Sequence, residues 1–326
     1  MIRQQYDDDI DQILEPKHML KVWQAIESGH DKYFKLVLEQ DPLHLDGLAA
    51  LGTLKKSKKS KPGDAPAPWV AAFKKAIEGF QPEADQYRTF FDPKAMEEYA
   101  HSRGTFKPAL GKGCPIIRHT LHSQSRELLE WHKKYNITKP AVLLDMFTAL
   151  VDFHRKYTKN TKPASFAKFD KLGQFAFDPI EDDEDCRING VIGMGIKSAV
   201  LHNLTPALFP PRDRYSLLGF YLLTNYDAFG LPSDSSEFIM YDPDKQLPDG
   251  TIYGSHNYWY PYALFTLYSL RLYRRIKAAL APLKVDLDDH YRFVYTMAFL
   301  HKVCDQEKDK IKTFVAHDVL NRFVAI

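Results

Sequence analysis

Residues 262–280 have the sequence YALFTLYSLRLYRRIKAAL, the clearest helical pattern in the chain. Apolar side chains recur every four residues from Leu264 to Leu280, and Leu267 lies beside this row. The cationic side chains of the stretch fall largely outside the row; they are Arg271, Arg274, Arg275 and Lys277. Such a helix needs other elements to cover its apolar face, so the stretch predicts a helical core packed around it.

Further stretches show the same spacing. Residues 141–157 carry a broad apolar face, and Pro140 before them suits the first turn of a helix. Helical spacing also occurs in residues before Leu51 and in residues 69–80, 92–101, 126–135, 289–303 and 309–323. No run of alternating residues predicts a strand, and no internal repeat is found. The predicted fold class is therefore mainly α, a multi-helical globular protein with a helix-hairpin-helix-like element.

Composition divides the chain into three parts. Residues 1–53 form a predicted N-terminal helical segment, which we interpret as an appendage. Residues 54–68 hold five lysines followed by alternating proline and alanine, and they predict a surface loop or linker because they offer almost nothing to bury. Residues 69–326 form the predicted main helical domain, with the hairpin at 188–204.

Charge and cysteine content exclude several function classes. The net charge of +2, from 44 Lys and Arg against 42 Asp and Glu, gives no global basic field, so a nucleic-acid site must be a local patch. Cys114, Cys186 and Cys304 are odd in number and far apart, which predicts thiols without a disulfide, a metal or another cofactor. The N-terminus is acidic and no uncharged run reaches about 18 residues. We expect a cytoplasmic protein without a membrane partner.

The stretch from Ile188 to Leu204 has the most specific spacing, beginning Ile-Asn-Gly-Val-Ile-Gly-Met-Gly-Ile-Lys-Ser. Apolar residues at 188 and 191 would end a short helix, and a second helix would run over residues 196–204. Between them, Gly193 and Gly195 would permit a tight turn that a Cβ atom would obstruct. Free N–H groups at the start of the second helix predict a seat for phosphate. The predicted nucleic-acid-binding residues are Gly193, Met194, Gly195, Ile196, Lys197 and Ser198.

These residues resemble the helix-hairpin-helix motif over about 14 positions, which implies contact with a DNA backbone and little reading of base sequence. In helix-hairpin-helix DNA glycosylases a lysine just after the second glycine attacks the sugar, and an aspartate opening a later helix assists. The resemblance places Lys197 at the first position and Asp213 at the second. The interval between them is shorter than expected of those enzymes, and Arg-Tyr-Ser follows Asp213 where they usually have Thr-His-Val.

The residues after the hairpin, Leu201-His202 and then Pro206 to Pro210, are similar to those in a looser group of prokaryotic proteins with helix-hairpin-helix-like segments. That group implies no defined activity. Three alternatives therefore stay open: a DNA-binding protein, a glycosylase or lyase that uses Lys197 and Asp213, and a non-catalytic protein-interaction scaffold.

Other clusters have simpler explanations. His119 and His122 could share a helix face, but no third metal ligand follows. The acidic stretch 242–250 lacks the glycine offset and final glutamate of a calcium loop, and predicts a surface turn. The tyrosines and tryptophan of residues 253–262 predict packing more than base stacking. No nucleotide-binding glycine loop or Ser or Cys nucleophile signature is present.

Overall fold

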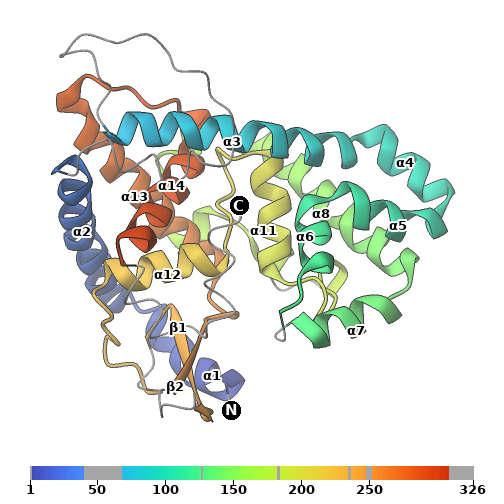
Figure 1. Ribbon diagram of the computed structural model, residues 1–326, viewed down its shortest axis with the longest axis horizontal. Coiled ribbons are helices and arrows are strands. Elements are labelled where there is room, and N and C mark those ends of the chain that lie inside the picture. The colour runs from blue at the N-terminus through green and yellow to red at the C-terminus, as the bar shows by residue number, and fades with distance from the viewer. Residues whose placement is uncertain are drawn as a thin grey trace.

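The computed structural model describes residues 2–39, 68–125, 128–181, 184–233, 236–246 and 252–307, and it confirms the mainly helical fold class (Figure 1). The α-helices are α1 (Ile2–Ile13), α2 (Pro16–Glu39), α3 (Pro68–Phe90), α4 (Pro93–His101), α5 (Arg103–Gly113), α6 (Pro115–His122), α7 (Leu129–Ile137), α8 (Pro140–Asn160), α9 (Pro163–Phe166), α10 (Asp178–Glu181), α11 (Met194–Leu204), α12 (Arg214–Leu223), α13 (Tyr262–Leu280) and α14 (Arg292–Gln306). Short 3-10 turns are η4 (Leu172–Gln174), η5 (Glu184–Cys186), η6 (Ala281–Leu283) and η7 (Asp289–Tyr291).

Helix α13 is the centre of the core. Its bounds match the predicted stretch, and 12 of its 19 residues are buried. Helices α2 and α14 pack against it. Phe220 of α12 meets Phe265 of α13 edge to face, with ring centroids 5.7 Å apart. The apolar row read from the sequence is thus covered from several sides, which is why this helix organises its neighbours.

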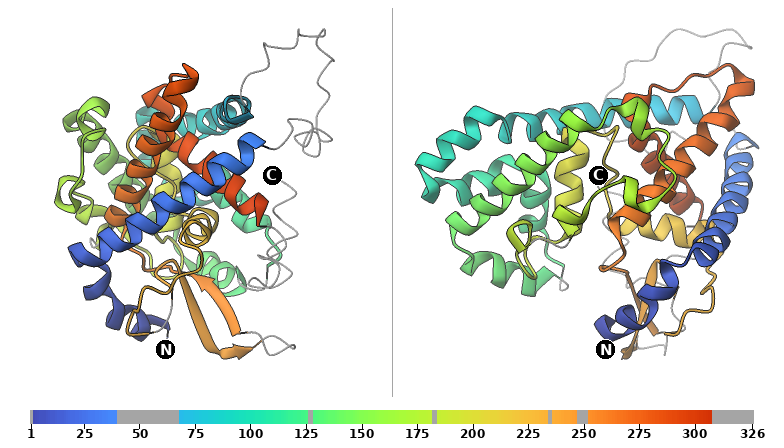
Figure 2. Two further views of the ribbon diagram at one scale, coloured as in Figure 1. Left: turned by 90° about the vertical axis from the view of Figure 1, so that its left-hand side faces the viewer. Right: turned by 180° about the vertical axis from the view of Figure 1, so that it is seen from behind.

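Helix α3 joins the two ends of the molecule (Figures 1 and 2). It contacts α2 and α14 at one end and α4, α5, α6 and α11 toward the other. Trp69 in its first turn is fully buried and donates to the Phe34 carbonyl at 3.1 Å. Beyond it, α5 packs on α6 and α8, which forms the second helical layer.

The N-terminal helices belong to the core, so the interpretation of residues 1–53 as an appendage is wrong. In α2, Val22 and Ile26 have no exposed surface and Tyr33 is 2% exposed. Arg275 of α13 forms a bidentate ion pair with Asp31 of α2 at 2.7 and 2.9 Å. Sequence periodicity shows that α2 has an apolar face but not what covers it.

Two strands correct the expectation that no strand is present. Strand β1 (Ile239–Gln246) pairs antiparallel with β2 (Ile252–His256), and the register shifts between Asp242 and Gln246. The sequence of β1, IMYDPDKQ, contains a proline and two aspartates, which are depleted in strands, so no alternating pattern reveals it. Residues 40–67, 247–251 and 308–326 lie outside the described residues; these hold nearly all of the predicted linker, the tip of the predicted turn and the predicted last helix.

Replacing Leu267 by alanine tests the central role of α13. Leu267 has no exposed surface, so Leu267→Ala leaves a cavity and lowers the free energy of unfolding by about 2–5 kcal/mol in chemical denaturation. Leu20→Ala is the matched control, because Leu20 is 54% exposed and its loss changes stability little. Equal losses in the two variants would contradict this description of the core.

Candidate functional site

The 188–192 segment forms a tight turn before α11. Ile188 and Ile192 make an isolated antiparallel bridge, and the N–H groups of Val191 and Ile192 both donate to the Ile188 carbonyl at 2.9 Å. Gly190 has φ +72°, and a Cβ there would lie 2.6 Å from Lys134 Nζ. Glycine is therefore required at 190, and the amine of Lys134 lies directly over the turn.

The turn differs from the predicted hairpin in two ways. The residues before it, Glu184–Cys186, form one 3-10 turn and not an α-helix, so the element has a single helix, α11. Gly193 and Gly195 do not require glycine. A Cβ on Gly193 would meet nothing within 4 Å, and one on Gly195 would lie 3.7 Å from the Arg212 carbonyl oxygen, which is ordinary contact. The expectation that a side chain would obstruct the turn at these positions is wrong.

The first turn of α11 is exposed at its two glycines, while Met194 and Ile196 are half-buried against the core. Its first backbone hydrogen bond runs from Lys197 N to the Gly193 carbonyl at 3.1 Å, and no side chain caps the helix. Gly193 and Gly195 are exposed. Among the described residues no acceptor binds the N–H groups of Met194, Gly195 and Ile196. Three donors and the positive end of the helix dipole therefore point outward at one place.

Lys197 points the other way. The residue is 3% exposed, and its Nζ donates to the Ile180 carbonyl in α10. Burial lowers the pKa of the amine to about 8, and the nearest charged or ionisable groups include Cys186, Arg212 and Glu181. The predicted phosphate contact by the Lys197 side chain is therefore not formed by this geometry, since the amine lies inside the protein.

Ser198 is also buried and connects α11 to the residues before α12. Its hydroxyl accepts from Arg212 N at 2.9 Å and donates to the Gly195 carbonyl at 3.2 Å. The Arg212 guanidinium in turn donates to the carbonyls of Tyr258, at 2.8 Å, and Tyr260. Tyr260 is fully buried, whereas Tyr258 is 48% exposed. Ser198 thus positions the backbone before α12. Of the aromatic residues whose burial is described, Tyr260 packs in the core and Tyr258 lies at the surface.

Asp213 caps a helix and does not meet Lys197. Its carboxylate accepts from Ser216 N at 2.7 Å and the Ser216 hydroxyl accepts from Asp213 N at 3.0 Å, a capping box that opens α12. In the described structure no hydrogen bond or ion pair joins Asp213 to Lys197, whose amine is held by Ile180. The two residues of the glycosylase resemblance therefore have separate structural roles.

Substitutions at Asp213 distinguish capping from charge. Asp213→Ala removes the cap and lowers the free energy of unfolding by about 1 kcal/mol, whereas Asp213→Asn keeps it because asparagine caps as well as aspartate. Thermal or chemical denaturation measures both. A loss as large in Asp213→Asn as in Asp213→Ala would show that the charge, and not the capping acceptor, is what the site needs.

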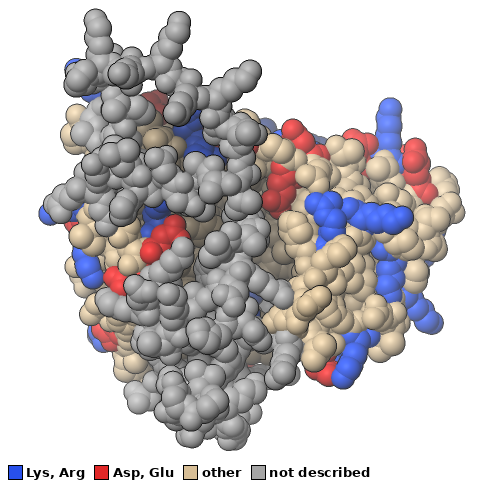
Figure 3. All heavy atoms as spheres, viewed as in Figure 1, with Lys and Arg blue, Asp and Glu red and all other residues tan. Residues whose placement is uncertain are grey.

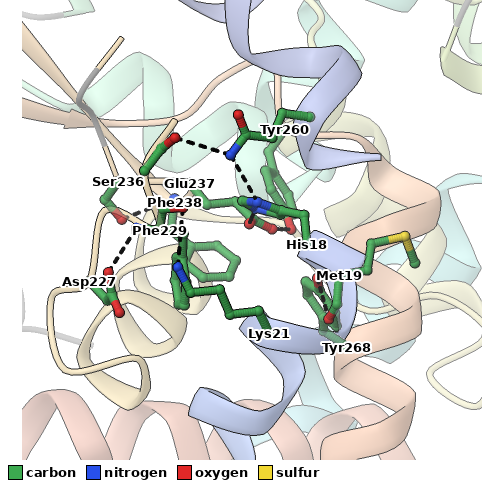
Figure 4. Close-up of polar contacts among 12 residues, drawn as sticks. His18, Met19, Lys21, Asp227, Phe229, Ser236, Glu237, Phe238, Tyr260 and Tyr268 are labelled. Carbon is green, nitrogen blue, oxygen red and sulfur yellow. Dashed lines mark hydrogen bonds and ion pairs between the residues drawn. The ribbon is translucent and has the colours of Figure 1, made fainter. Parts of the chain in front are cut away.

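A buried polar network forms around Glu237, two residues before β1 (Figure 4). The carboxylate of Glu237, which has no exposed surface, accepts from His18 Nε2 at 2.7 Å and from the Tyr260 hydroxyl. The Gln12 amide nitrogen donates to the Gly230 carbonyl at 3.1 Å and lies 3.4 Å from His18 Nδ1. Nδ1 therefore accepts, and the ring proton sits on Nε2 facing Glu237. The network fastens α1 and α2 to residues 230–260.

The charge state of Glu237 gives a pH-dependent prediction. Burial raises its pKa above the ordinary value of 4.5, opposed by the hydrogen bonds from His18 and Tyr260. A raised folded-state pKa contributes stability that is complete below the unfolded pKa and is lost as pH rises through the folded pKa. The stability advantage of the parent over Glu237→Gln therefore shrinks as pH rises above about 4.5. Denaturation of both proteins across pH measures it, and a growing advantage would contradict it.

The remaining predicted residues show no metal chemistry. His122 Nδ1 lies 2.7 Å from the Arg118 carbonyl of its own helix, and His119 is exposed. In the part of the chain that the structure describes, no group of three or more His, Cys, Asp or Glu side chains could hold a metal ion. No disulfide joins the three cysteines, which are all buried. None of the described helices is both long and apolar enough to cross a membrane.

Sequence reasoning missed the residues that support the turn from α7. Trp131 Nε1 donates to the Val191 carbonyl at 2.6 Å, and Lys134 covers Gly190. Helix α7 precedes the turn by about 60 positions, so no local pattern indicates this contact. The His18 and Glu237 pair, 219 positions apart, is equally invisible to sequence spacing.

Comparisons with known proteins add little to this geometry. No family model matches the chain. No solved structure matches it either. The AP-1 accessory protein LAA1 of Saccharomyces cerevisiae is 29% identical over 79 residues, which are 24% of this chain and 4% of that protein. The chain thus corresponds to a very small part of that relative, and the match establishes no family.

Proposed function

We propose that this protein binds a DNA backbone through the 188–192 turn and the first turn of α11, with no covalent chemistry. The observation that carries the proposal is the exposed, uncapped start of α11. At three other helices carboxylates occupy such positions: Asp92 caps α4, Asp213 caps α12, and Glu181 accepts from the first N–H group of α13. Helices α5 to α9 and α14 begin without a side-chain cap, as α11 does. At the start of α11, a phosphate oxygen would accept hydrogen bonds from the same kind of backbone N–H groups that donate to a carboxylate at α12 and α13.

Charge on α7 supports the same assignment. Lys134 is exposed and its amine lies against Gly190, so a phosphate over the turn would have a cation beside it. On the face drawn in Figure 3, several Lys and Arg side chains lie over the α5 to α7 end, and other Lys and Arg side chains lie at the opposite edge. Of the neighbouring acidic run, Glu181 is directed to α13 and away from the turn.

The lyase alternative has no support from the side-chain geometry. A lysine nucleophile must reach the sugar of a bound strand, and a supporting carboxylate must lie near it. Lys197 is buried against Ile180, and Asp213 is committed to Ser216. The role we propose for Lys197 is to fix α11 on α10 so that the first turn of α11 stays outward.

A charge placed at Gly193 tests the proposal. Gly193→Glu adds a carboxylate where phosphate would bind, and Gly193→Gln is the matched neutral control; both fit because the space is open. We expect Gly193→Glu to weaken binding of a short fluorescein-labelled DNA duplex by at least about fivefold in fluorescence anisotropy, equivalent to about 1 kcal/mol. Gly193→Gln should bind nearly as the parent does.

Two results would reject this site. Equal binding by Gly193→Glu and Gly193→Gln would remove the start of α11 as the contact. Failure of the folded parent to bind DNA at low salt would remove the function itself and favour the protein-interaction alternative. In that case the partial similarity to a protein described as an AP-1 accessory protein would be the feature to pursue.

A further inference from the structure

A concentrated basic surface lies at the C-terminal end of α8 and in the turn after it. Residues 155–171 contain six cationic side chains and one carboxylate, Asp170. We call the six the basic surface: Arg155, Lys156, Lys159, Lys162, Lys168 and Lys171. All six are exposed. Arg155 pairs with Asp152 at 3.4 Å, and within the described residues no ion pair holds any of the five lysines.

Arginines from the core fix the shape of this surface. Arg274 of α13 donates to the carbonyls of Ala167, at 2.7 and 2.9 Å, and Phe169, at 2.6 Å. Arg292 of α14 donates to the Pro163 carbonyl at 3.0 Å. The carbonyl groups of the turn are therefore directed inward, and the lysines between them project outward. Figure 2 (right) shows this yellow-green segment on the face opposite to that of Figure 1.

The supporting arginines add to the positive charge beneath the turn. Arg292 has no exposed surface and no ion pair among the described residues; its guanidinium packs on the rings of Phe166, at 5.6 Å, and Tyr273, at 5.8 Å. Arg274 is likewise held by carbonyls and not by a carboxylate. Asp289 and Asp170 lie close enough to Arg292 and Arg274 to offset part of their charge, so the positive field at the turn comes mainly from the exposed lysines.

The chemistry of the surface selects its ligand. Residues 155–171 include no large apolar side chain that is exposed, so the basic surface lacks the anchors that a membrane or a protein partner needs. Lysines spaced along a fixed turn can instead each contact a different phosphate of a nucleic-acid strand. Binding of these phosphates releases counterions. We infer that the basic surface is a second contact for a nucleic-acid backbone, distinct from the turn at 188–192. The inference takes its ligand class from the proposed function but names different residues.

The test removes charge from the basic surface and compares an equal loss elsewhere. The variant is Lys159→Gln, Lys162→Gln, Lys168→Gln and Lys171→Gln together. The control is Lys17→Gln, Lys35→Gln, Lys75→Gln and Lys94→Gln, which are exposed lysines on other helices. With the labelled duplex, we expect the basic-surface variant to bind at least about 10-fold more weakly, and its salt dependence to fall by about 2–4 in slope, as about 0.9 per phosphate contact predicts. Circular dichroism checks that both variants fold.

Each outcome separates the two proposals. If Gly193→Glu weakens binding and the basic-surface variant binds as its control does, the inference fails and the proposed function stands. If only the basic-surface variant weakens binding, the inference stands and the start of α11 is not the contact. If the folded parent binds no duplex, or if it binds phosphatidylserine vesicles or polyglutamate through these lysines as tightly as DNA, the inference is overturned.

Discussion

The burial of α13 is the constraint on which the rest of the structure depends. A helix with an apolar row and further buried residues on both sides of it must be covered by several elements at once. Helices α2 and α14 contribute to that cover although they come from opposite ends of the sequence. The start of α13 is fixed as well, because Glu181 accepts from the N–H groups of Tyr262 and Ala263. The segment that leads to α11 is thereby tied to the core before the turn begins.

The polar side of α13 is as specific as its apolar side. Arg275 pairs with Asp31 and fastens α2, while Arg274 fastens the turn at 167–169. From the sequence alone, these arginines are expected to face solvent. Helical periodicity shows which residues lie outside the apolar face but does not show which groups they bind. Their partners are carbonyls and a carboxylate more than 100 positions away.

Sequence patterns predicted the elements that local chemistry determines. The bounds of α13 follow from its periodicity, and the start of α8 follows from the preference of proline for the first turn of a helix. The failures have a different origin. Strand β1 is defined by its pairing with β2, and the direction of Lys197 is set by the Ile180 carbonyl. Neither is determined by the residue types of the segment itself, so the glycines and the lysine at 193–197 suggested side-chain roles that the fold does not give them.

In this molecule the backbone donors at the start of α11 and the exposed cationic side chains lie on different segments, and this separation has a physical reason. A lysine in the first turn of α11 lies close to the core, and a buried ammonium needs acceptors, which the Ile180 carbonyl provides. A cationic side chain that is to contact a ligand must instead lie on a segment whose backbone carbonyl groups already accept hydrogen bonds from other residues. Lys134 on α7 and the lysines of the 162–171 turn meet this requirement, the latter because Arg274 and Arg292 occupy the carbonyls beneath them. The segment at 188–204 thus offers backbone donors, whereas the exposed cations lie on residues that no motif marks.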